Sequence, residues 1–170
     1  MRTVSQLDDF GPGGSDLVNS VWPKTREEVA CQENVVSALN QVLAHIIDLE
    51  TRTKRAHWNA KGGNFYSLHK MLDDFAGDLD AIADEIGERV MAVGGVATGN
   101  VFEVAKRSTL TQEPPRSTRA DDVIKSLKDD YDVARLEVHK SFETLAVLED
   151  DASMDIVLST MKLLDKQRSF

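Results

Sequence analysis

Two histidines flank a Gly-Gly pair in the first half of the chain, and both are residues that can bind a metal ion or move a proton. His57 precedes the glycines, and His69 follows them, four residues before Asp73. Residues four apart in a helix are neighbours on one face, so His69 and Asp73 form a pair. Asp84 and Glu88 form a second such pair further along the chain. Imidazole and carboxylate ligands without a thiolate suit iron, manganese or zinc.

The separation between the two pairs decides how a metal ion could be shared. Asp73 and Asp84 are eleven residues apart, close to three helical turns, so both pairs face the same way. Eleven residues also span roughly 16 Å of helix, too far for one ion to contact both pairs of one chain. Two antiparallel copies about a two-fold axis near Asp78–Leu79 would bring unlike pairs together. The spacing predicts two identical inter-subunit sites per dimer, with His57 able to reach either its own chain's pair or the shared site.

Ordinary surface pairing is the competing interpretation of these residues. Histidine–aspartate pairs at this spacing are common, and the spacing alone favours surface pairing over metal binding. The other acids of the segment are interpreted as a solvated helix face; they include Asp74, Asp80 and Glu85. His45 and His139 lie away from the cluster, and we interpret them as structural.

Apolar residues recur at helical spacing and predict the elements that carry these groups. Thr25-Arg26-Glu27-Glu28 has the capping-box pattern and begins a helix that ends near residue 58. The Gly-Gly pair separates it from a second helix over about 65–93. Two further helices are predicted over about 120–147 and 152–167. The last has one apolar face, made by Met154, Val157, Leu158, Met161 and Leu164.

A long connector joins the second and third predicted helices. It covers residues 96–118, with a short helix around 100–106, and it is long enough to cross the length of a bundle. Four amphipathic helices with one long crossover predict an all-α, ferritin-like four-helix bundle over residues 25–170. Residues 1–24 are rich in Gly, Pro and Asp and are predicted to form a flexible tail.

Composition narrows the classes of function. The 170 residues suit one globular domain, and 41% of them are hydrophobic. A net charge of −9 favours cations and argues against a strong nonspecific grip on nucleic acid. One cysteine, Cys31, excludes an internal disulfide framework and fits a reducing compartment. No signal-peptide pattern and no run of 18 apolar residues is present, so we expect a cytoplasmic protein without membrane contact.

The motif "TKRAHWNAKGGNFYSLHKMLDDF", followed by "DEIGERVMAVGG", strongly resembles the Dps family of DNA-protection-during-starvation proteins. The family pattern is K-x-x-H-W-N-x-x-G-x-x-F-x-x-L-H-x-x-[FL]-D, then D-x-x-x-E-R-x-x-x-L-G-G. Val93 stands where leucine is usual. The similarity is strong over about residues 40–100 and weaker, but in step, to about residue 165. The resemblance implies a ferritin-like mini-cage of twelve subunits built from two-fold dimers.

Carried over residue by residue, the resemblance implies a ferroxidase centre shared by two subunits. Its ligands would be His57, His69 and Asp73 from one subunit, with Asp84 and Glu88 from the two-fold mate. This assignment agrees with the pairing that the helical spacing requires.

Three further residues take roles from the same resemblance. Trp58 matches a tryptophan beside the iron site and is included among the catalytic residues, although packing at the dimer contact also explains it. Asp151 and Asp155 match acids that line iron-entry pores on the three-fold axes. The competing interpretation for these acids is the preference of carboxylates for helix N-termini.

The activity implied is oxidation of Fe(II) to Fe(III), with hydrogen peroxide as the usual oxidant and dioxygen as the slower one, and storage of the ferric product inside the shell. Zinc and manganese are alternative ions for the site. Such a mini-ferritin would protect DNA from oxidative damage in the bacterial cytoplasm or nucleoid.

The alternative function is a DNA-compacting stress protein with secondary metal binding. The acidic tail does not favour it, since phosphate binding needs cations. An ordinary ferritin or bacterioferritin is excluded because no glutamate is followed by histidine three positions on.

Overall fold

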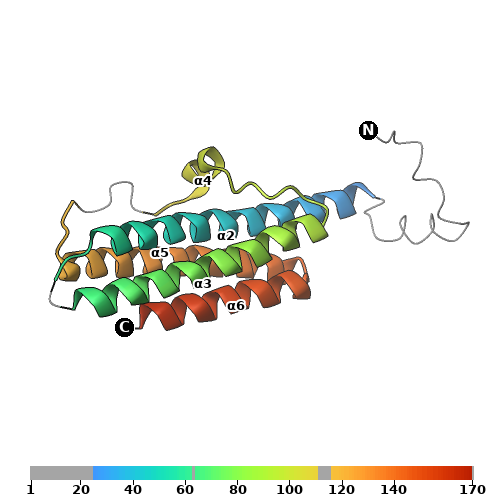
Figure 1. Cartoon of the computed structure of the whole chain (residues 1–170). Coiled ribbons are helices and arrows are strands. Elements are labelled where there is room, and N and C mark those ends of the chain that lie inside the picture. Colours follow the sequence, from blue (N-terminus) through green and yellow to red (C-terminus); the bar gives the residue numbers. More distant parts are fainter. Residues whose placement is uncertain (1–24, 63, 111–115, 170) are drawn as a thin grey trace, which may run out of the picture.

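The computed structural model describes residues 25–62, 64–110 and 116–169. Within them lie five helices in chain order, which are α2 (Arg26–Asn59), α3 (Phe65–Ala92), α4 (Val101–Arg107), α5 (Ala120–Val147) and α6 (Asp151–Arg168). The four long helices lie side by side, and the short α4 sits outside them (Figure 1). The predicted all-α bundle, with a long crossover that carries a short helix, is confirmed. The predicted tail over residues 1–24 falls outside the described residues.

The start of α2 follows from its capping residues. The Thr25 hydroxyl accepts a hydrogen bond from the Glu28 backbone N–H at 3.1 Å, and the Glu28 carboxylate accepts one from the Thr25 N–H at 2.9 Å. These reciprocal bonds satisfy two backbone donors that the first helical turn leaves without an intrahelical acceptor. The predicted capping box is therefore confirmed.

The end of α3 explains why two glycines follow it. Gly94 has φ 81°, a left-handed conformation that is strained for residues with a Cβ. This turn lets the Gly95 N–H donate to the Val90 carbonyl at 2.9 Å, which closes the helix. A Cβ on Gly95 would lie 2.5 Å from a methyl group of Val36 on α2. The first glycine is needed for backbone geometry and the second for space.

The core runs the length of the bundle between the apolar faces of the long helices. Its largest fully buried side chains include Leu39, Ile46, Leu49, Leu72, Leu79, Ile86, Tyr131 and Leu145. The predicted apolar face of α6 holds for Val157, Met161 and Leu164, which are buried. Leu158 was expected on the same face but is 36% exposed, because it lies one residue beyond Val157 at the edge of that face.

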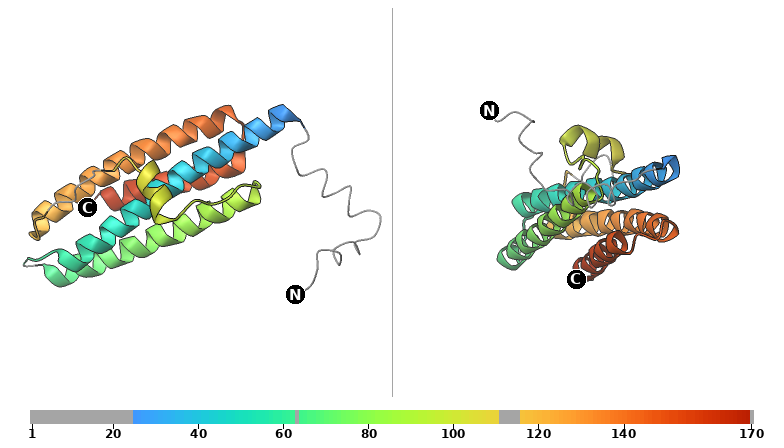
Figure 2. Two further views of the ribbon diagram at one scale, coloured as in Figure 1. Left: turned by 90° about the horizontal axis from the view of Figure 1, so that it is seen from above. Right: turned by 90° about the vertical axis from the view of Figure 1, so that its right-hand side faces the viewer.

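Polar side chains on α2 hold the crossover against the bundle. The Asn40 amide donates to the Val96 carbonyl at 3.0 Å, and its oxygen accepts from the Thr98 backbone N–H at 2.8 Å and from the Thr98 hydroxyl at 3.0 Å. Seen end-on, the crossover and α4 lie outside the bundle beside α2 (Figure 2). The buried Asn40 therefore fixes the first part of the crossover.

A second group of contacts fixes the crossover just after α4. The fully buried His45 donates from Nδ1 to the Gln41 carbonyl at 2.8 Å, and its Nε2 accepts from the Thr109 N–H at 3.2 Å. The Ser108 hydroxyl donates to Asp48 at 2.6 Å. The structural interpretation of His45 is confirmed. His139 instead lies exposed on α5, with its ring 3.7 Å from the Glu143 carboxylate.

In the part of the chain that the structure describes, no helix combines the length and the apolar character that a membrane span requires.

Candidate metal centre

The turn between α2 and α3 sets the two predicted histidines opposite each other. After α2 ends, the Lys61 N–H donates to the Thr118 carbonyl at 2.7 Å, and the Ala120 N–H donates back to the Lys61 carbonyl at 3.0 Å. This bridge ties the turn to the start of α5. The turn itself makes α2 and α3 antiparallel neighbours, so the last turn of α2 lies beside the first turns of α3 (Figure 1).

His57 and His69 form a reciprocal pair across the two helices. His57 Nδ1 lies 2.8 Å from the His69 carbonyl oxygen, and His69 Nδ1 lies 2.9 Å from the His57 carbonyl oxygen. A carbonyl can only accept, so each Nδ1 carries a proton, and the neutral ring keeps its lone pair on Nε2. The rings stack at 3.5 Å between centroids, and Phe65 also stacks with His69, at 5.0 Å. Metal-binding histidines commonly have this backbone hydrogen bond behind the ligating nitrogen.

Asp73 lies near the histidines but contacts a lysine. The Lys54 ammonium is 2.6 Å from Asp73 Oδ1. This hydrogen bond and the lysine charge lower the pKa of Asp73. Asp73 is therefore ionised, as a metal ligand must be. Lys54 was part of the sequence motif, but sequence reasoning gave it no role, because its contact lies nineteen residues away on another helix.

The second predicted pair stands on the same helix but apart from the first. Asp84 and Glu88 are exposed on α3, eleven and fifteen residues after Asp73. Across residues 25–62, 64–110 and 116–169 of one chain, no three His, Cys, Asp or Glu side chains gather closely enough to hold a metal ion. We name His57, His69 and Asp73 the first half-site, and Asp84 and Glu88 the second half-site. The described part of one chain therefore keeps the two predicted half-sites apart, and a metal centre that joins them stays a prediction.

Trp58 lies on the outside of the bundle next to the first half-site. It follows His57 directly and is 70% exposed. A tryptophan this exposed contributes little to the core of its own chain, so packing inside one subunit does not explain it. Its assignment as a catalytic residue stays a prediction.

The acids around the start of α6 have different environments. Asp150 is the N-cap; it accepts from the Ser153 backbone N–H at 3.2 Å and from the Ser153 hydroxyl at 2.7 Å. Arg89 of α3 donates to the same carboxylate at 2.8 Å. Asp151 and Asp155, the two predicted pore residues, are exposed on the first turns of α6. The capping role belongs to Asp150, and the pore assignment of the other two stays a prediction.

Replacing Asp150 with Ala is expected to lower the free energy of unfolding by about 1–3 kcal/mol near neutral pH, because the cap and the Arg89 contact are lost. Burial raises the pKa of Asp150, but the hydrogen bonds from Ser153 and the charge of Arg89 outweigh it and lower the pKa. Such a group adds stability above the unfolded carboxyl pKa of about 4 and loses it as the pH falls through the lower folded value. Urea unfolding should therefore show the gap between the two proteins narrowing below about pH 4.

The matched control is Asp151→Ala, which removes an exposed acid from the same turn. We expect it to cost less than about 1 kcal/mol at any pH, the range for a charge near a helix N-terminus. Equal losses for the two variants would contradict the capping role of Asp150.

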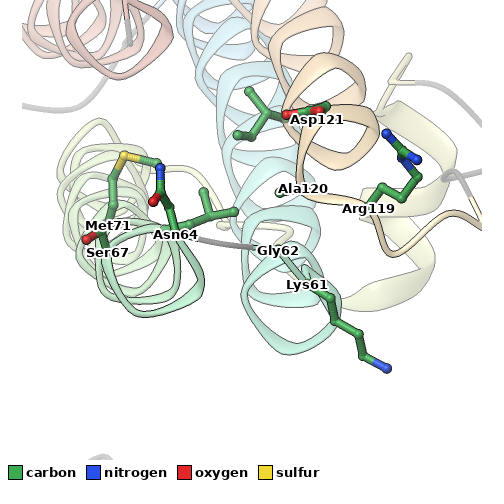
Figure 3. Close-up of a pocket in the computed structure, with 10 residues that line it drawn as sticks. Lys61, Gly62, Asn64, Ser67, Met71, Arg119, Ala120 and Asp121 are labelled. Atoms are coloured by element: carbon green, nitrogen blue, oxygen red, sulfur yellow. The ribbon is translucent and has the colours of Figure 1, made fainter.

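A groove of about 560 Å³ lies at the end of the bundle, between α3 and α5 (Figure 3). Asn64, Ser67 and Met71 line it from the α3 side, and Arg119 and Asp121 line it from the start of α5. It opens where α6 has already ended and α3 and α5 continue (Figure 1). None of its lining residues is a predicted metal ligand. The predicted ligands Asp73, Asp84 and Glu88 instead lie exposed on α3.

Comparison with known proteins identifies the family. A family model for the ferritin-like domain matches residues 36–169. The DNA protection during starvation protein of Agrobacterium fabrum is 32% identical over 149 residues, which cover 86% of this chain and 92% of that protein.

Solved structures agree. Dps from Staphylococcus aureus aligns with a TM-score of 0.75 at 28% identity, over 81% of this chain and 91% of that chain. DpsC from Streptomyces coelicolor aligns with a TM-score of 0.77 at 28% identity, over 82% and 81%. The chain therefore belongs to the Dps family of ferritin-like proteins.

Proposed function

We propose that this protein is a ferroxidase and iron-storing mini-ferritin, whose substrate Fe(II) binds where the first half-site of one subunit meets the second half-site of its two-fold mate. The observation that carries the proposal is the reciprocal His57–His69 hydrogen bonding, which puts the lone pair of each ring on Nε2, with the ionised Asp73 one turn beyond His69 on α3. Two imidazoles and carboxylates are hard-to-borderline ligands that suit iron, with zinc and manganese as competing ions.

The carboxylates give the site its direction of chemistry. Anionic oxygens stabilise Fe(III) more than Fe(II), so they favour loss of an electron. Hydrogen peroxide takes two electrons and two protons as its O–O bond breaks, and it yields two water molecules. Two Fe(II) ions supply these electrons, or one ion supplies one and a neighbouring donor such as Trp58 supplies the other. Neither route releases a hydroxyl radical, which links the chemistry to protection of DNA.

The remaining functional assignments belong to the same proposal. The two-fold dimers assemble into a shell of twelve subunits that stores the ferric product, and Asp151 and Asp155 line its iron-entry pores. The net charge of −9 repels phosphate and supports iron chemistry over DNA compaction as the primary role. A protein of this kind works in the bacterial cytoplasm.

Removing the second half-site tests the proposal. Fe(II) is added without oxygen, hydrogen peroxide follows, and ferric absorbance is recorded. We expect Asp84→Ala plus Glu88→Ala to lower the rate by at least about 100-fold, because iron loses direct ligands. The matched control is Asp74→Ala plus Glu85→Ala, which removes two exposed acids from the same helix and should leave the rate within about twofold. An assembled double variant of Asp84 and Glu88 that oxidises iron at the wild-type rate would overturn the proposed site.

A further inference from the structure

The positive charge of Lys54 lies beside Asp73, where the charge of a bound metal ion is expected. It lies on α2 one turn before His57, and its ammonium contacts the Asp73 carboxylate at 2.6 Å, although both side chains are partly open to solvent, at 36% and 53%. A divalent ion bound by the first half-site would share the carboxylate that this ammonium already contacts. Placing two cations on one carboxylate costs electrostatic free energy, because like charges a few ångströms apart repel strongly.

Two further carboxylates surround Lys54 and offer it another place. Glu50 lies one turn before Lys54 on α2, an arrangement in which a glutamate and a lysine pair favourably. Asp80 faces the same region from α3. Burial raises the pKa of Glu50, and the charge of Asp80 raises it further, whereas Lys54 opposes the shift. These two carboxylates therefore repel each other and gain from a cation between them.

Lys54 carries a positive charge at neutral pH, as lysine side chains ordinarily do. This ammonium can exchange one carboxylate partner for another, but it stays charged. A metal ion that binds Asp73 must therefore either bind beside this charge or displace it.

We propose that Lys54 is a displaceable internal cation: it holds Asp73 in the metal-free site and moves to the Glu50–Asp80 pair when a divalent ion binds Asp73. This inference rests on the proposed function, since it concerns the same half-site. It assigns the lysine a role in setting metal affinity, with Glu50 and Asp80 as its alternative partners. Sequence reasoning interpreted Asp80 as part of a solvated helix face and did not consider Glu50.

Cobalt(II) binding without oxygen tests the competition, because Co²⁺ reports on its ligands through visible absorbance and needs no oxidation step. We expect Lys54→Gln to bind Co²⁺ at least about tenfold more tightly than the wild type, since one competing charge is gone. The matched control is Lys70→Gln, which breaks the exposed Lys70–Asp74 pair on α3. It should stay within about twofold of the wild type. A Lys54→Gln protein that binds Co²⁺ as the wild type does, or more weakly, overturns the inference.

A double-mutant cycle tests the movement of the ammonium. Glu50→Gln is expected to weaken Co²⁺ binding about tenfold in the wild-type background and less than about threefold in the Lys54→Gln background, where no ammonium needs a new partner. Equal effects in both backgrounds would show only the long-range field of Glu50 and would overturn the movement. If the wild type binds Co²⁺ and oxidises iron, and the Lys54 variants bind Co²⁺ no differently from the control variant, this inference alone is removed. No Co²⁺ binding by wild type or Lys54→Gln removes the proposed function as well.

Discussion

Two inactive variants are expected to restore iron oxidation when they assemble together. The first carries His69→Ala and Asp73→Ala in the first half-site, and the second carries Asp84→Ala and Glu88→Ala in the second half-site. Each alone loses direct ligands at every site, so each should oxidise Fe(II) at least about 100-fold more slowly than the wild type. In a mixed dimer one site collects all four changes and the other collects none. Random pairing therefore leaves about a quarter of all sites intact and should return about a quarter of the wild-type rate.

The physical reason is the distance along α3. The two half-sites of one chain stand roughly 16 Å apart, so a site confined to one subunit could not use both. Co-expression with two affinity tags isolates the mixed assemblies, and ferric absorbance after peroxide addition measures their rate. A mixture of separately assembled shells is the control and should stay inactive. Mixed assemblies that remain as slow as either parent would place the ligands of each centre in a single subunit.

Sequence reasoning was most accurate where a regular spacing of apolar residues ends at a clear helix boundary. The predicted limits of α5 match the structure, because its apolar face ends at the same place as its backbone hydrogen bonding. The start of α2 was readable because the Thr25 and Glu28 side chains form their bonds locally. The placement of Leu158 on the apolar face was wrong, because periodicity assigns a side chain to a sector of the helix. It does not say how far the neighbouring helices extend over that sector.

The candidate site shows the same division between local and distant information. The His69–Asp73 and Asp84–Glu88 pairs follow from spacing within one helix, so the sequence placed them on α3 without a structure. The contacts of Lys54 with Asp73 and of Arg89 with Asp150 join different helices. Hydrogen bonds of this kind leave no periodic pattern in the sequence, so only the structure shows which acids pair with a lysine or an arginine.

The crossover supplies the clearest case of such hidden contacts and the second large effect. Replacing Asn40 with Ala is expected to lower the free energy of unfolding by about 2–4 kcal/mol, because three hydrogen bonds to the crossover disappear together. The Val96 carbonyl and the Thr98 N–H, which are only partly buried, lose a side-chain partner, and each lost hydrogen bond costs about 1 kcal/mol net. Urea unfolding at one fixed protein concentration measures the loss, since assembly also contributes to stability.

Asn34→Ala is the matched control, since Asn34 is an exposed asparagine on the same helix and its removal should change stability by no more than about 0.5 kcal/mol. Hydrogen exchange separates the proposed cause from a general weakening of the core. In Asn40→Ala the Thr98 amide should exchange faster, while amides in the middle of α5 should change only as much as global stability requires. An unchanged Thr98 exchange rate would mean that the crossover is held by His45 and Asp48 just after α4, and that Asn40 contributes only its own packing.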